Sequence, residues 1–180
     1  MSNEPTMRGL NPAEILRRFQ TRLRTRLNVP DAACFVAEEA RNVFPESMPD
    51  KAYIITSEGS SFNADVDQWR EYLVETQYID VTCFNRLSSI DESDRAHSLT
   101  SPYETNLFEM KRRVLAALVG WRLELPEDAV LPMIASTVKA NRCGRPEFLS
   151  TPDGGIHAAF LPITFHVSYA VDYCNEDFNV

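Results

Sequence analysis

The sequence predicts a single α+β domain in which a mainly antiparallel sheet carries two helices on one face. Three observations predict it. Two stretches place apolar residues at helical spacing, short β-branched runs lie between them, and an unbroken apolar–polar alternation occupies the C-terminal part. The 180 residues suffice for one domain with a real core and are short for two, so we assign residues 1–180 to one domain.

The first helix is expected over residues 11–27. Asn11 is a good N-cap, Pro12 suits the first turn, and Glu14 stands three residues after the cap, as in a capping box. The apolar stripe consists of Ile15, Leu16, Phe19, Leu23 and Leu27. We expect this stripe to pack on the rest of the domain. The alternative is a basic amphipathic helix that lies on a membrane surface.

The second helix is expected to start at Ser101-Pro102-Tyr103-Glu104, which has the same cap, proline and acid order. Its buried stripe should consist of Leu107, Phe108, Val114, Leu115 and Leu118. Gly120 is the expected C′ residue.

Strands are expected at residues 52–56, 71–84 and 133–138. In the second of these, Ile79, Val81 and Cys83 share one face. After the turn signal at 151–155, Leu161, Ile163, Phe165, Val167, Tyr169, Val171 and Tyr173 alternate with more polar residues. This alternation is typical of a strand with one apolar and one polar face.

Four segments are expected to be irregular. We predict a flexible N-terminus over about residues 1–10, loops at 58–67 and 86–100, and an irregular stretch at 141–150. The loop at 86–100 is long for a connection in a compact domain, so we expect it to contact a neighbouring subunit.

Charge is unevenly distributed. The formal net charge of −8 argues against a general nucleic-acid binder, because phosphate contacts need a basic surface. Residues 1–26 nevertheless contain six arginines and two acids, whereas residues 146–180 contain five acids and no lysine or arginine. The candidate interface residues are Arg17, Arg18, Arg22, Arg24, Arg26, Asp91, Glu92 and Asp94. These charges either guide docking to other chains or are simply solvated.

No catalytic, cofactor-binding or metal site is predicted. The six glycines form no phosphate-binding motif, and no G-x-S-x-G, H-x-x-H or calcium-loop spacing occurs. Asp153 and His157 resemble an acid–base pair, but such a pair across a turn is more often a surface feature, as are His97 and His166.

The cysteines are expected to be free thiols, three of them core fillers. They are Cys34, Cys83, Cys143 and Cys174. With no apolar run long enough to span a bilayer and no secretory signal at the start, the expected location is a cytoplasm.

The order of these patterns resembles the tail terminator (tail completion) proteins of long-tailed bacteriophages. The resemblance runs from about Asn11 to Tyr173 and is carried by five features. They are the N-terminal helix, Ala52-Tyr53-Ile54-Ile55, Ile79-Asp80-Val81-Thr82-Cys83, Val114-Leu115-Ala116-Ala117-Leu118, and Phe165-His166-Val167-Ser168-Tyr169 after the Pro-Asp-Gly turn.

The resemblance implies a structural virion protein without enzymatic activity or cofactor. It implies a homo-oligomeric ring, commonly a hexamer, that closes the tail tube, joins it to the head connector or stopper protein and lets DNA pass without specific binding. The protein would be in the host cytoplasm during assembly and in the virion neck afterwards. The alternatives are another neck or tail component, such as a head completion protein or tail tube subunit, and a small cytoplasmic enzyme.

Overall fold

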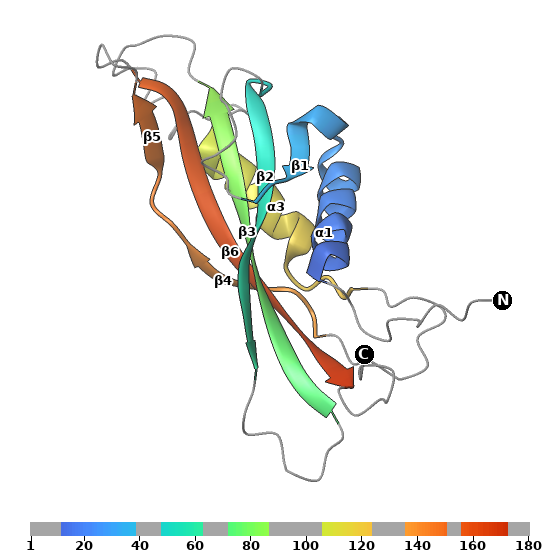
Figure 1. Cartoon of the computed structure of the whole chain (residues 1–180). Helices are drawn as coiled ribbons and strands as arrows, with labels where there is room; N and C mark the ends of the chain where they lie inside the picture. The colour runs from blue at the N-terminus through green and yellow to red at the C-terminus, as the bar shows by residue number, and fades with distance from the viewer. Residues whose placement is uncertain are drawn as a thin grey trace, which may run out of the picture.

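The computed structural model describes residues 12–38, 48–62, 72–86, 106–123, 136–150 and 156–172. Helices α1 (Pro12–Leu27) and α3 (Leu107–Leu118) lie on one face of a twisted six-stranded sheet (Figure 1). A 3₁₀ turn, η1 (Asp31–Ala33), leads into the first strand. The strands are β1 (Cys34–Val36), β2 (Lys51–Phe62), β3 (Tyr72–Arg86), β4 (Lys139–Cys143), β5 (Glu147–Ser150) and β6 (Ile156–Asp172). The predicted α+β class and the mainly antiparallel sheet are confirmed.

The strand order is β1-β2-β3-β6-β4, and β5 also pairs with β6. All pairings are antiparallel except that of β1 with β2. The β3–β6 ladder runs from Tyr72 opposite Asp172 to Arg86 opposite Ala158. One half of β2, β3 and β6 extends past the two helices (Figure 1).

The main core lies between the helices and the sheet. Alternate side chains of β6 from Leu161 to Tyr169 are buried there, as the alternation predicts. Helix α1 contributes its predicted stripe of Ile15, Phe19, Leu23 and Leu27. The ring of Phe19 meets Phe165 and Trp121 edge-on, with centroids 6.4 and 5.6 Å apart.

The second face of the sheet carries a smaller apolar cluster, so it is not polar throughout. The cluster consists of Met48, Ala52, Ile54, Phe84 and Ala158, with Phe160 packed against it. This patch lies where the ends of β2, β3 and β6 meet, because Ala52 faces Phe84 and Phe84 faces Phe160.

Helix α3 differs from the prediction at its start and in its stripe. It begins at Leu107 and is capped by Asn106, whose side-chain oxygen accepts the Glu109 N–H at 2.7 Å, so the start predicted at Ser101 is wrong for this helix. The side chain of Phe108 is 46% exposed, because one residue after Leu107 the helix has turned by about 100°. Met110 and Ala117 are buried in the stripe instead. Gly120 follows the C-cap with φ +78°, as predicted.

The prediction of a loop at 58–67 is wrong for residues 58–62, because β2 continues to Phe62 through a bulge between Ser57 and Gly59. Gly59 has φ +91°, and the Gln77 amide on β3 donates to Ser57 Oγ and to Gly59 O, both at 2.9 Å. Polar residues therefore remain in the strand because a buried partner satisfies the irregular backbone.

The irregular stretch predicted at 141–150 contains most of β4 and all of β5, and both strands are held by backbone pairing to β6. The side chains of β4 are mainly polar, whereas Phe148 and Leu149 of β5 are apolar. Of the strand expected at 133–138, the structure describes residues 136–138, and these form no strand but only an isolated bridge between Thr137 and Arg122. The next strand, β4, starts at Lys139. The N-terminal segment 1–10, residues 63–67 and 87–100 of the predicted loops and the turn at 151–155 lie outside the described residues.

Candidate functional site

Three of the five α1 arginines have partners within the chain. Arg18 pairs with Glu14 at 2.5 Å, and Arg24 pairs with Asp31. Arg22 donates from Nε to Ala117 O at 3.2 Å and lies over the Trp121 ring, 5.4 Å from its centroid. The contacts of Arg24 and Arg22 hold α1 against η1 and α3. Three of the five arginines are therefore engaged within the chain and are not all available to another protein.

The other two arginines, Arg17 and Arg26, are exposed and form no ion pair among the described residues. Arg17 lies about 200° around the helix axis from Ile15 and therefore faces away from the sheet. Thr21, one turn further on, is also exposed. The outward side of α1 therefore offers a cation that the described part of the chain does not neutralise.

The other predicted site residues are not gathered with α1. Asp91, Glu92, Asp94, His97 and Asp153 lie outside the described residues, as does Cys174, and the side chain of His157 is not described. His166 is half-buried on the second face of β6, with its ring 6.1 Å from that of Tyr78.

Two cysteines fill the core, as expected. Cys34 and Cys83 are buried, and Cys143 is exposed. Cys174 lies outside the described residues, so the third core filler stays a prediction. Burial raises the pKa of the Cys34 thiol to about 12, although nearby Arg24 lowers it. Burial likewise raises the pKa of Cys83. Both thiols are therefore protonated and unreactive at neutral pH.

A pocket of about 840 Å³ lies on the face of the sheet away from the helices. Its position follows from strand alternation, since Asp80 and Thr82 on β3 alternate with the core residues Ile79 and Val81. Its charged lining consists of Glu38, Glu58, Asp80, Glu147 and Arg142. Its apolar lining consists of Phe148, Leu149, Phe160 and Pro162.

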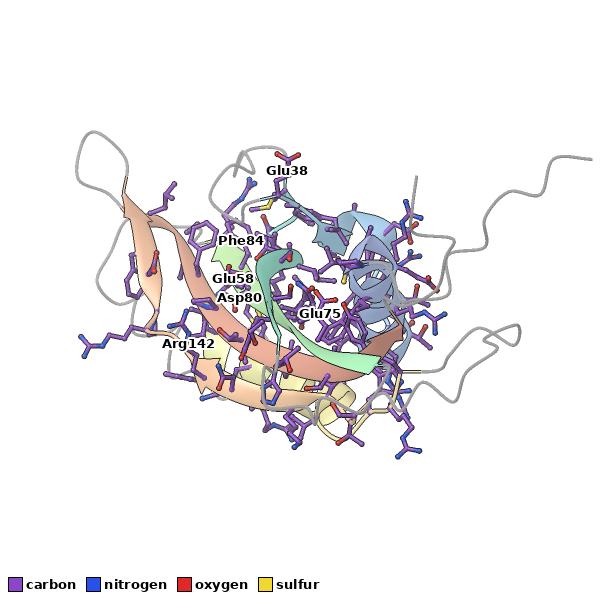
Figure 2. All side chains as sticks on the ribbon, turned by 60° about the horizontal axis from the view of Figure 1, so that its bottom comes forward. Glu38, Glu58, Glu75, Asp80, Phe84 and Arg142 are labelled. Atoms are coloured by element: carbon purple, nitrogen blue, oxygen red, sulfur yellow. The ribbon has the colours of Figure 1, made fainter. Side chains whose placement is uncertain are left out.

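The lining of this pocket contains four carboxyl groups and one guanidinium. The guanidinium also donates from Arg142 Nε to Thr164 Oγ1 at 3.2 Å. Figure 2 shows Glu58 and Asp80 beside each other, from neighbouring strands. Burial and the adjacent Asp80 raise the pKa of the Glu58 carboxyl, while Arg142 lowers it. Asp80 Oδ1 is buried and has no hydrogen-bond partner among the described residues.

This lining suits a cation that carries N–H donors. Such a group would satisfy the buried Asp80 oxygen and relieve the repulsion between Glu58 and Asp80. The aromatic rings of Phe148 and Phe160 could lie against its apolar stem or its charged end. No cluster of three or more ligating side chains in the described part of the chain could hold a metal ion. We call this hollow, with its lining of four acids and one arginine, the acidic pocket.

Sequence patterns did not reveal the pocket because its lining comes from β2, β3, β4, β5, β6 and the residues after β1. Glu58 was assigned to a loop and Arg142 to an irregular stretch, so neither was placed on a strand. One signal of the pocket was present in the sequence. Asp80 and Thr82 are polar and two residues apart, so they share the face of β3 opposite the core.

Comparison with protein-family models and with curated proteins finds no match. Within the described residues, no helix is both long enough and apolar enough to cross a membrane.

Proposed function

We propose that this chain is the subunit of a homo-oligomeric ring that closes the end of a long-tailed phage tail tube and joins the tail to the head connector. The observation that carries the proposal is the placement of opposite charges on opposite faces of one subunit. Arg17 points outward from the helix-covered face, and the acidic pocket opens on the other face.

Two different complementary surfaces on one subunit favour a head-to-tail contact between identical chains. Such a contact closes into a ring when each step adds a fixed rotation. The net charge of −8 also suits a channel through which DNA passes, since negative walls repel phosphate. The chain has an α+β fold, which is the fold class that the proposed role implies.

The proposal is tested by adding the purified chain to tail tubes of the virus that carries its gene. A terminator should bind only at tube ends and stop further elongation, as seen by electron microscopy of gold-labelled protein. Incorporation along the tube would identify a tube subunit, and binding to the head connector alone would identify a stopper protein. A chain that binds neither structure and remains monomeric would overturn the proposal.

A further inference from the structure

Two edges of the sheet have no neighbouring strand among the residues that the structure describes. The first is the outer side of β4, the last strand in the order β1-β2-β3-β6-β4, and all five of its residues are exposed. The second is the outer side of residues 57–61 of β2, because β1 pairs only with Tyr53, Ile54 and Ile55. These five residues are also exposed, and their strand partner is β3 alone. Each edge therefore presents main-chain groups to which a further strand can be added.

The edge at β1 differs, because helix α1 covers it. The Gln20 side chain of α1 donates to Cys34 O at 2.8 Å, and Cys34 Sγ donates to Gln20 O at 3.9 Å. The second half of β2, by contrast, lies in the part of the sheet that extends past the two helices (Figure 1). A described element therefore closes the β1 edge, whereas the edges at β4 and at the second half of β2 stay accessible to another chain.

The two open edges match in direction and in length. Strands β2 and β4 run in opposite directions, because three antiparallel pairings separate them: β2 with β3, β3 with β6, and β6 with β4. When two copies lie side by side in the same orientation, β4 of one copy therefore meets β2 of the other as an antiparallel pair. Antiparallel pairing is slightly more stable per residue than parallel pairing. Both open segments are five residues long.

We propose that β4 of one copy pairs with residues 57–61 of β2 in the next copy, so that the sheets of neighbouring subunits join into one. This inference rests on the proposed function, because it names the contact that joins neighbouring ring subunits. Addition of a strand to an open sheet edge gains its affinity from main-chain hydrogen bonds. Each copy uses two different edges, so the contact is head-to-tail and leaves one free edge at each end of a pair.

The charges on the two edges favour this pairing over a symmetric one. Strand β4 carries Lys139 and Arg142, whereas residues 57–61 carry Glu58. Two β4 strands paired with each other would bring their cations together, and like charges on paired strands are destabilising. Glu58 is hydrogen-bonded to Asp80 of its own chain. The charges therefore select the partner edge, and the main-chain hydrogen bonds provide the affinity.

A cross-linking experiment on the full chain tests this contact. With the ends of the two segments matched in an antiparallel pair, Ser60 of one copy lies beside Ala140 of the next. Both residues are exposed. Ser60 is paired with Gln77 and Ala140 with Phe165, two residues that are buried on the core side of the sheet. Their side chains therefore lie on the same face of the joined sheet.

One variant carries Ser60→Cys and a second carries Ala140→Cys. In both, Cys143 and Cys174 are replaced by serine, and the other two cysteines are buried. Circular dichroism checks the fold of each variant. The two variants are mixed at a concentration at which the parent assembles and are joined with a short bis-maleimide reagent, and the cross-links are mapped by mass spectrometry. Each variant alone is the matched control.

We expect cross-linked heterodimers in the mixture to exceed homodimers of either variant by roughly tenfold, because head-to-tail contact brings Ser60 to Ala140 and keeps two copies of the same residue a sheet width apart. Homodimers formed by the Ala140→Cys variant alone would show symmetric pairing of β4 and would overturn the proposal. A parent that forms rings in the electron microscope without these cross-links would overturn this contact but not the ring. A parent that remains monomeric at every concentration would overturn both.

Discussion

Phe165 on β6 lies at the centre of the core that joins the sheet to both helices. Its side chain is fully buried, faces Ile79 on β3, and contacts the Phe19 ring of α1 edge-on. Replacing it with alanine removes the whole ring and leaves a cavity under α1. A buried aromatic side chain withdraws roughly 150–250 Å² from water. At about 25 cal/mol per Å², this corresponds to about 4–6 kcal/mol.

Alanine retains the Cβ atom, and the neighbouring side chains relax into part of the space. We therefore expect Phe165→Ala to lower the free energy of unfolding by about 3–5 kcal/mol. For a chain of this size, the melting temperature should fall by roughly 6–20 °C. Truncation of a phenylalanine outside the core should leave no such cavity. Phe108, which is 46% exposed, provides a matched control, and Phe108→Ala should cost less than about 1 kcal/mol.

Thermal and urea unfolding followed by circular dichroism would measure both variants at concentrations where the parent is monomeric. If Phe165→Ala and Phe108→Ala melt within a degree or two of each other, the packing of β6 against α1 and α3 is wrong.

Three further substitutions and one labelling experiment have expected outcomes. Asn106→Ala should lower stability by about 1 kcal/mol through loss of the α3 cap, whereas Asn106→Asp should retain it, and equal urea midpoints for both would contradict the cap. Gly59→Ala should cost about 1–2 kcal/mol from the φ of +91° alone, because nothing lies within 4 Å of the position that the new Cβ would occupy; an unchanged melting temperature would argue against the bulge. The raised pKa of Glu58 means that ionisation is disfavoured in the folded state, so parent stability should fall relative to Glu58→Gln as pH rises through that pKa. A stability difference that is constant from about pH 4 to 7 would exclude this effect. Among the cysteines that the structure describes, a thiol reagent should modify Cys143 in the native protein and leave Cys34 and Cys83 unmodified until the chain is denatured, as mapped by mass spectrometry. Rapid labelling of Cys34 would contradict its burial.

The sequence predicted the elements that combine a clear period with a buried face. The stripe of α1 and the alternation of β6 are both of this kind, and both are found as expected. Their apolar residues recur at 3.6 and 2.0 positions because each element has one face in the same core. Gly120 was also identified correctly, since a positive φ after a helix favours glycine.

The errors lie where tertiary partners override local sequence. The polar run after Glu58 remains a strand because Gln77 binds the bulge, and the polar residues of β4 and β5 are ordered by backbone pairing to β6. The Asn106 cap of α3 was missed, because the order of cap residue, proline and acid at Ser101 was taken as the start of this helix.

The partners of Arg22 and Arg24 were also missed, because Ala117 and Trp121 are far from α1 in sequence and the Asp31 pair depends on the turn at η1. The acidic pocket combines residues from six segments, so no local spacing indicates it.

Electron microscopy of the purified full chain at low salt would show whether its subunits form a ring. We expect closed rings of one size, each with a central channel, formed by head-to-tail contact of identical subunits. Separate subunits or symmetric dimers at every concentration would contradict it.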